Sequence, residues 1–338
     1  MKKLLIASAA VLLLASAVIA YAAYDMYKYM HAPLQKNNPK TASFAISPGD
    51  NFDRITEKLR DHDLIDNALK FEIIARWKGF ERRIQAGEYQ LSNKMTPMEL
   101  LQALSRGQVV LYNVTIPEGF NIRQVARQME AAGLTGIDAF LAAATNPGLT
   151  RQLSVPADTF EGYLFPDTYA FARTADPERI IKAMVAELRA NFPAKWHERA
   201  QELGFSVHEM ITLASIIEKE TGVADERPVI ASVFHNRLRK NMRLESDPTV
   251  IYGIKNFDGN LTRADLRKPT PYNTYQIRGL PAGPIANPGK ASIRAALYPA
   301  DTDYLYFVAK PDRTHHFSKT LNEHNRAVRK YQLSSDRP

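Results

Sequence analysis

The chain opens with a long uncharged segment, and this segment constrains the rest of the fold more than any other feature. After Met1, Lys2 and Lys3, residues 4–24 read LLIASAAVLLLASAVIAYAAY, without a charged side chain. About 20 apolar residues are enough for a helix to cross a bilayer. We therefore expect residues 1–30 to form a cytoplasmic tip and a membrane-spanning anchor, because lysines before a span favour the cytoplasmic side.

A cleaved signal peptide is the alternative interpretation of this segment. Ala20-Tyr21-Ala22 resembles a cleavage site made of small residues. Cleavable signals usually have a shorter apolar part, about 7–15 residues, so the sequence favours an uncleaved anchor. Both interpretations place the remaining chain outside the cytoplasm. We predict a single-pass protein of the cell inner membrane, with its C-terminal body in the periplasm.

Charge and cysteine content narrow the function classes. The chain has 44 Lys and Arg against 36 Asp and Glu, a net charge of +8, which suits DNA, anionic lipid or an acidic polymer. The basic residues are interleaved with acids, and an exported protein meets no genome, so we expect no nucleic-acid partner. The lack of cysteine excludes disulfides and thiolate metal sites.

The exported part starts with a polar stretch and continues into a folded module. Residues 31–43, HAPLQKNNPKTAS, contain two prolines and no apolar periodicity, which predicts a linker. From Phe44 the chain reads as a strand, a Pro-Gly turn and an amphipathic helix. The apolar side of that helix carries Phe52, Ile55, Thr56 and Leu59.

This strand-turn-helix pattern recurs 70 residues later, which indicates a duplicated unit. The matched pairs are Ile46 and Ile116, Gly49 and Gly119, Asn51 and Asn121, Phe52 and Ile122, Ile55 and Val125, Leu59 and Met129, and Leu64 and Leu134. Between the copies we expect a strand around Tyr89 and a helix opened by Thr96-Pro97, with Glu99 at capping-box spacing. Together these pieces predict one small α+β module over residues 44–155.

The first copy resembles the glycan-binding LysM module, which has a strand, a Gly-Asp turn and an amphipathic helix. A plain packing module is the alternative. A second domain is expected over residues 156–338. It begins with the aromatic stretch TFEGYLFPDTYAFAR at residues 159–173, interpreted as a loop and strand at a junction, followed by a helix over residues 177–191.

Two acids in an apolar segment are the first candidates for chemistry. Residues 213–222 read LASIIEKETG and carry Glu218 and Glu220. Ser206 and Glu209 form a capping box, so a helix is expected from Val207 to Thr221, ended by Gly222. Aliphatic neighbours disfavour the charged form of a carboxyl and raise its pKa, which would suit a general acid. Pairing of both acids with arginines such as Arg227 or Arg237 is the alternative.

Polar and aromatic residues gather in the next 75 positions. Amide and phenol side chains suit a sugar-binding groove, because a pyranose offers hydroxyls at its rim and C–H bonds on its faces. A Pro/Gly-rich loop follows at residues 279–289 and is expected to be rigid. The predicted substrate-binding residues are Glu220, Asn236, Ser246, Asp247, Tyr252, Tyr272, Asn273 and Tyr275.

Four stretches in order carry a family resemblance. They are EGYLFPDTY at residues 161–169, ASIIEKET at 214–221, SDPTVIYG at 246–253 and YNTYQIRGLPAGPIANPG at 272–289. With the N-terminal span, they make the chain similar to the YceG-like family of endolytic murein transglycosylases over nearly its whole length. The resemblance implies an α+β catalytic domain in which the first glutamate of E-K-E-T, here Glu218, is the catalytic acid. It leaves the role of Glu220 open.

The resemblance implies a lyase that acts on peptidoglycan. Such an enzyme cuts the β-1,4 bond between N-acetylmuramic acid and N-acetylglucosamine inside nascent strands, leaves a 1,6-anhydro end and ends strand elongation. Glu218 would protonate the bridging oxygen and then remove the proton of the 6-hydroxyl as that oxygen closes onto C1. Water is not the nucleophile, so a second carboxylate is not required. No cofactor is implied, and peptidoglycan synthases are candidate partners.

Two other functions stay open at this point. A non-catalytic glycan-binding anchor for wall-synthesis machinery needs no protonated carboxyl, and a muramidase would cut the same bond with water. A metal site at His315, His316 and His324, with Asp312 and Glu323 nearby, matches no ligand spacing such as H-E-x-x-H. Adjacent histidines in a strand point to opposite faces, so no metal is expected there.

Overall fold

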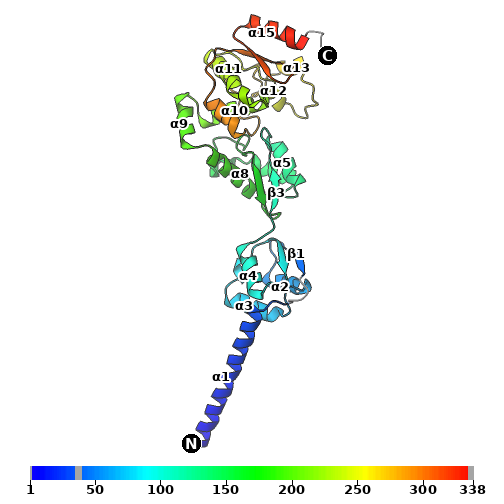
Figure 1. Ribbon diagram of the computed structural model, residues 1–338, viewed down its shortest axis with the longest axis vertical. Helices are drawn as coiled ribbons and strands as arrows, with labels where there is room; N and C mark the ends of the chain where they lie inside the picture. The colour runs from blue at the N-terminus through cyan, green and yellow to red at the C-terminus, as the bar shows by residue number, and fades with distance from the viewer. Residues whose placement is uncertain (1, 35–39, 334–338) are drawn as a thin grey trace. The chain divides into compact units, whose positions relative to one another are not determined.

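The computed structural model describes residues 2–34 and 40–333, which form two compact units (Figure 1). One unit comprises residues up to Tyr112 together with Ala170–Thr174, and the other comprises Asn113–Tyr169 and the chain from Ala175 onward. Both units mix helices with short two-stranded sheets. The expected mixture of helix and strand is therefore confirmed.

The first unit packs helices around a two-stranded antiparallel sheet. Its elements are α1 (Lys2–His31), β1 (Thr41–Ile46), α2 (Phe52–Asp61), α3 (Ala68–Trp77), η1 (Glu81–Arg83), β2 (Gly87–Ser92) and α4 (Pro97–Arg106). Phe44 of β1 lies opposite Tyr89 of β2, and both rings are fully buried. Gly107 ends α4 in the left-handed conformation, which glycine adopts without steric cost.

Helix α1 is the apolar segment expected from the sequence. Its stretch Leu5–His31 is long and apolar enough to span a membrane. The helix continues past residue 24, and β1 already begins at Thr41, so the expected linker is shorter than residues 31–43. Residues 35–39 of that linker, and Met1, lie outside the described residues.

The local predictions for the first unit are confirmed. The residues expected on the apolar side of α2, Phe52, Ile55, Thr56 and Leu59, are all buried. The capping box at Thr96 and Glu99 is formed, with Pro97 in the first turn of α4. A hydroxyl or amide that accepts from the first free N–H groups stabilises a helix start, which explains why such signals are readable locally.

The second unit is mostly helical and contains every predicted site residue. Strands β3 (Tyr112–Thr115) and β4 (Thr168–Phe171) are divided between the two units. The other elements of the second unit are α5 (Ile122–Ala131), α6 (Ile137–Ala144), α7 (Pro147–Gln152), α8 (Pro177–Asn191), α9 (Ala194–Glu202), α10 (Val207–Glu220), η2 (Ala224–Glu226), α11 (Arg227–Arg239), α12 (Asp247–Tyr252), α13 (Arg263–Arg267), α14 (Lys290–Leu297), β5 (Tyr306–Ala309), β6 (His315–Ser318), α15 (Leu321–Val328) and the π-helical turn η3 (Arg329–Leu333). The predicted helix over residues 177–191 is α8, with the same bounds.

Helix α10 runs through the core of the second unit. Ser206 caps its start and forms the expected box with Glu209, and every residue from Met210 to Ile217 is buried. The helix packs against α11 and α14. It ends at Glu220, one residue before the predicted end, and Thr221 is extended. The last turn carries both candidate acids.

The expected domain boundary at residue 155 does not coincide with the division between the units. The second copy of the repeat has the predicted strand and helix, with Ile122, Val125 and Met129 buried. That copy belongs to the second unit, whereas the first copy belongs to the first. Local periodicity identifies an element but does not say which core it joins. The aromatic stretch at residues 159–173 is divided between the units, in line with its interpretation as a junction.

Candidate active site

Glu218 lies in the last turn of α10, and its side chain is 6% exposed. Its Oε2 accepts a hydrogen bond from the backbone N–H of Gly289 at 2.9 Å. Arg227 at the start of α11 places Nη2 3.8 Å from the other oxygen, Oε1. The side chain is thus buried as expected, but its partners are a backbone N–H and a guanidinium rather than aliphatic groups alone. Glu218 thus pairs with Arg227, as the alternative interpretation of the sequence proposed.

Glu118 brings a second carboxylate to the same place. Its Oε2 lies 4.0 Å from Nη2 of Arg227, the nitrogen that also approaches Glu218. Burial raises the pKa of the Glu118 carboxyl, the charge of Glu218 raises it further, and Arg227 acts in the opposite direction. The site therefore holds two acids and one cation, an arrangement that couples the protonation of its members.

Gly289 is the point where both acids meet the loop of residues 279–289. A Cβ atom at this position would lie 1.8 Å from Oε1 of Glu118, far inside contact distance. A glycine is therefore needed for Glu118 to lie in its present position. Gly119 borders the other acid less tightly, because its Cβ would lie 3.5 Å from Cγ of Glu218, an ordinary contact distance.

The buried amide of Asn287 holds the walls of the site together. Its Nδ2 donates to the carbonyl of Phe120 at 2.8 Å, and its Oδ1 accepts from the N–H of Leu164 at 2.9 Å. Its backbone also bonds with Gly119 and Phe120. Ser215 of α10 accepts from the N–H of Ile285 at 3.0 Å. These bonds attach the Pro/Gly loop to α10 and to the turn that carries Glu118.

Three predicted residues come together around Glu220, the second acid of α10. Ser246 donates from Oγ to Oε1 of Glu220 at 2.5 Å, and Tyr275 donates from its hydroxyl to Asp247 at 2.6 Å. Burial raises the pKa of Glu220 to about 7, the Ser246 hydrogen bond lowers it, and the charge of Asp247 raises it. The alternative pairing with Arg237 is not formed, because Arg237 pairs with Glu245 at 3.2 Å.

Two further predicted residues, Tyr252 and Tyr272, are partly buried and lie beside the buried Glu161. The tyrosine rings lie 4.8 Å apart, and the Tyr252 hydroxyl donates to Oε2 of Glu161 at 3.0 Å. Glu161 also accepts from the N–H of Ile122, the first residue of α5, at 3.2 Å. Burial raises the pKa of Glu161 to about 8 despite these hydrogen bonds.

Asn236 and Asn273 use their amide nitrogens on the protein backbone. Nδ2 of Asn273 donates to the carbonyls of Asp265, Leu266 and Lys268 at 2.8–3.2 Å, and the residue is fully buried. Nδ2 of Asn236 donates to the carbonyls of Thr302 and Tyr304. These contacts hold loops in place. Their predicted role in binding substrate stays a prediction.

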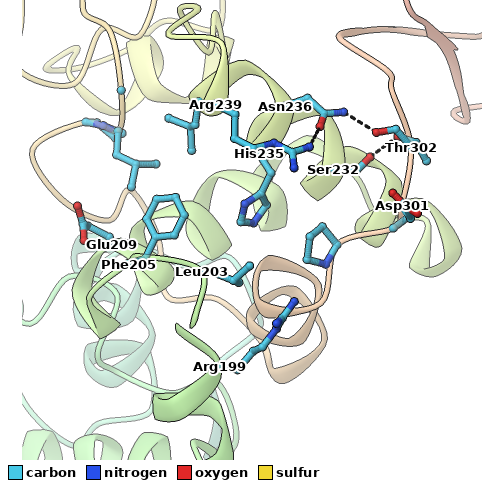
Figure 2. A pocket seen from close by; sticks show the side chains of 16 residues that line it. Arg199, Leu203, Phe205, Glu209, Ser232, His235, Asn236, Arg239, Asp301 and Thr302 are labelled. Atoms are coloured by element: carbon cyan, nitrogen blue, oxygen red, sulfur yellow. Dashed lines mark hydrogen bonds between the residues drawn. The ribbon is translucent and has the colours of Figure 1, made fainter. Parts of the chain in front are cut away.

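Asn236 lines a pocket that the other predicted site residues do not line. The pocket measures about 770 Å³ and lies between α9, the start of α10, α11 and the segment 299–302. Figure 2 shows the Asn236 amide turned toward Thr302, with His235 on the same helix facing Phe205 and Leu203. A volume alone does not locate chemistry, so we place the candidate active site at the acids and not in this pocket.

Sequence reasoning missed Glu118, Glu161 and Asn287 as site residues. Glu118 occupies the position that Pro48 holds in the first copy of the repeat, and this departure from the repeat was a usable signal. Glu161 and Asn287 stand inside the stretches that carry the family resemblance, but no local pattern separates a site residue from its neighbours there.

The C-terminal histidines lie in separate contacts. Nδ1 of His315 is 2.7 Å from Glu226, His316 packs on Tyr331, and His324 stacks on Tyr306. His315 is partly buried and His316 exposed, consistent with opposite faces of β6. Within residues 2–34 and 40–333, no group of three or more His, Asp or Glu side chains could hold a metal ion.

Comparisons with known proteins show which chains this one is similar to. The chain is 35% identical over 323 residues to an endolytic murein transglycosylase of Bacillus subtilis, covering 90% of this chain and 88% of the relative. A protein of the same name from Streptococcus pneumoniae is 29% identical, and the match covers 92% of this chain but 63% of that longer relative.

A solved structure has a similar fold. The 2.6 Å crystal structure of a putative YceG-like protein from Listeria monocytogenes aligns with a TM-score of 0.58 and 34% identity, covering 86% of this chain and 100% of that one. Residues 44–330 match the YceG-like family. On this match, and on the 35% identity to the Bacillus subtilis protein, the chain belongs to the YceG-like family.

Proposed function

We propose that this protein is an endolytic lytic transglycosylase of murein, with Glu218 as its catalytic acid. The observation that carries the proposal is the position of Glu218: it is almost fully buried at the end of α10, with Oε2 on the Gly289 N–H and a second acid beside it. The names of the relatives support the same reaction class.

In the proposed reaction, protonated Glu218 donates its proton to the oxygen that links N-acetylmuramic acid to N-acetylglucosamine. The bond from C1 to that oxygen breaks, and the 6-hydroxyl of the muramic acid closes onto C1. The Glu218 carboxylate takes the hydroxyl proton, so the acid is regenerated and the product carries a 1,6-anhydro end. Glu118 approaches the same guanidinium, and Arg227 stabilises the Glu218 carboxylate once the proton has been transferred to the bridging oxygen.

The remaining predicted residues are assigned around this acid. We propose that Ser246, Asp247 and Tyr275, near Glu220, and the Tyr252–Tyr272 pair contact the sugar. We also propose that α1 anchors the protein in the inner membrane, with its body in the periplasm. The first unit binds glycan as a LysM-like module. The enzyme ends strand elongation beside peptidoglycan synthases. The apolar stretch of α1 and the strand-turn-helix of the first unit support the first two assignments.

Glu218→Gln tests the reaction. The amide keeps the shape of the side chain but cannot supply the proton, so strand cleavage should fall on the order of 10²–10⁴-fold. In the assay, purified glycan strands are incubated with the full chain in detergent, and the masses of the products are measured by mass spectrometry. Transglycosylase products end in anhydro sugars and are one water lighter than the products of a muramidase.

Three outcomes distinguish the alternatives. Retained cleavage by Glu218→Gln would move the acid elsewhere, and a parallel Glu220→Gln variant would show whether it is Glu220. Products that carry one additional water would identify a muramidase. Glycan binding without cleavage by the wild-type chain would identify a binding anchor.

A further inference from the structure

Helix α3 of the first unit exposes an apolar stripe. Leu69, Ile73 and Trp77 follow one another at helical spacing and are 67%, 46% and 71% exposed. The opposite side of the same helix is buried in the core of the unit through Phe71 and Ile74. A tryptophan and two aliphatic side chains in a row on an otherwise charged surface indicate a face that contacts an apolar partner.

Contacts with α1 fix where this stripe lies along the membrane normal. The uncharged residues 4–24 would extend about 30 Å as a helix, the thickness of the hydrocarbon core. Asp25 is the next charged residue, and its Oδ2 lies 2.6 Å from Nζ of Lys70 in the first turn of α3. One turn later, the Tyr29 hydroxyl donates to the carbonyl of Asn67, the cap of α3, at 2.9 Å. Helix α3 therefore begins at the level where α1 leaves the bilayer, and Figure 1 shows it at the end of the first unit that α1 enters.

The side chains around the stripe suit the headgroup region of a bilayer. Nζ of Lys78 lies 4.3 Å from the centre of the Trp77 ring, and Lys78 is exposed. Arg76, on the same turn, approaches the carboxylates of Asp53, Glu72 and Glu81. Tyr24 and Tyr27 of α1 are exposed at the same level. Tryptophan and tyrosine concentrate at membrane interfaces, where lysine and arginine reach the lipid phosphates.

We propose that α3 lies on the bilayer that α1 spans, with Leu69, Ile73 and Trp77 in the interfacial layer and Lys78 on anionic headgroups. The proposal rests on the membrane anchoring proposed above. It gives the first unit a second contact with the lipid, so that the unit is held against the membrane surface rather than tethered by α1 alone.

Tryptophan fluorescence tests this contact directly, because the chain has two tryptophans. Trp196→Phe leaves Trp77 as the sole reporter in the full chain, reconstituted into vesicles of phosphatidylethanolamine and phosphatidylglycerol. We expect blue-shifted emission that brominated lipids quench, and bromines near the headgroup should quench more than bromines at the bilayer centre. Trp77→Phe provides the baseline, since Trp196 is buried in the second unit. The difference between wild type and Trp77→Phe gives the Trp77 signal without altering Trp196.

A variant that keeps the reporter sharpens the test. Leu69→Ser with Ile73→Ser removes two exposed side chains that do not support the core, and it should lower the quenching of Trp77 at least about twofold by weakening burial in lipid. Water-like emission without quenching, in a chain that floats with the vesicles, would overturn the α3 contact and leave the anchor standing. A chain that does not float with vesicles would overturn the anchor and the contact together.

Discussion

The two copies of the strand-turn-helix repeat share a backbone pattern but place acids differently. In the first copy Asp50 lies inside its own turn, where hydrogen bonds from Lys58 and from the Ser47 N–H lower the pKa of its carboxyl. The second copy has Phe120 at that position. Its turn instead meets acids from elsewhere in the chain, Glu218 and Glu161.

The difference distinguishes Asp50, an acid that stabilises its own turn, from the acids of the second copy, which can hold a proton near neutral pH. An acid that is held ionised by its own turn stabilises the turn and has no proton to give near neutral pH. Burial raises the pKa of Glu161 to about 8, and burial and Glu218 raise that of Glu118. One local fold thus serves as a packing unit in the first copy and as a wall of the candidate site in the second.

The largest expected effect concerns Glu161, against which the helix of the second copy begins. Its folded pKa of about 8 exceeds the ordinary value of 4.5, so the folded protein binds the proton more tightly than the unfolded chain. The contribution of Glu161 to the stability of the fold is therefore fully present below pH 4.5 and is lost as the pH rises toward 8. Relative to Glu161→Gln, the free energy of unfolding of the wild type should fall by a few kcal/mol between these two pH values, because each unit of pKa difference corresponds to roughly 1.4 kcal/mol.

Urea unfolding of both proteins across this pH range measures the difference. The amide that replaces the Glu161 carboxyl can still accept from the Ile122 N–H and from Tyr252, so the variant should fold. Glu220→Gln serves as a separate comparison, because burial also raises the pKa of Glu220. Parallel curves for wild type and Glu161→Gln would show that Glu161 is ionised throughout.

The next effect comes from leucine at the matched glycines Gly49 and Gly119. Both have positive φ, +88° and +76°, so each substitution should cost roughly 1–2 kcal/mol of stability. Added atoms at Gly119 grow toward Glu218, whereas no atom lies within 4 Å of a Cβ at Gly49. Strand cleavage should fall on the order of a hundredfold for Gly119→Leu, since displacing a catalytic group by about 1 Å has such an effect. Cleavage by Gly49→Leu should be unchanged.

Thermal melting and glycan cleavage are measured on the same preparations of this pair. Gly119→Ala is the milder control, because its methyl group would sit at ordinary contact distance from Glu218. Equal activity losses at Gly49 and Gly119 would mean that the loss follows destabilisation and not the neighbouring acid.

A smaller effect is expected at Glu118, where the second copy departs from the first. Glu118→Ala removes one of the two acids that approach Nη2 of Arg227, so the guanidinium is held less firmly beside Glu218, and cleavage should fall about tenfold, equivalent to about 1.4 kcal/mol. Gly289→Ala should have the same effect, because its methyl group would displace the Glu118 carboxylate.

A double-mutant cycle decides whether the two changes act through one contact. If Gly289→Ala acts by displacing Glu118, it should have little further effect once Glu118 is replaced by alanine. Additive losses in the double variant would show that Gly289 acts through its own backbone, most directly through its N–H on Glu218.

The sequence predicted those features of the fold that are written in neighbouring residues. Ser206 with Glu209 fixed the start of α10, and the apolar spacing of α2 and α5 fixed their buried sides. The position of Glu218 in the last turn of α10 followed from these signals. The burial of the Glu218 side chain followed as well.

Long-range contacts account for the rest. Glu118, Glu218 and Gly289 meet across more than 150 residues, and no local pattern encodes such a meeting. A sequence also does not say whether an amide faces a ligand or a backbone carbonyl, and Asn273 uses its amide on three carbonyls. The repeat predicted two similar elements but could not assign each copy to its own core.

The smallest expected effect is that of Asp50→Asn in the first copy. Hydrogen bonds hold the pKa of Asp50 below its ordinary value of 3.8, so its carboxylate stabilises the fold above that pH and loses this contribution as the pH falls through the folded value. The melting temperature of Asp50→Asn should therefore be slightly below that of wild type at neutral pH, and the two should converge in strong acid. Asp53→Asn, which removes an exposed pair with Arg76, is the matched control. Glycan cleavage should be unchanged in both variants, because Asp50 and Glu218 belong to different units. A loss of cleavage in Asp50→Asn alone would contradict the division between a packing copy and a catalytic one.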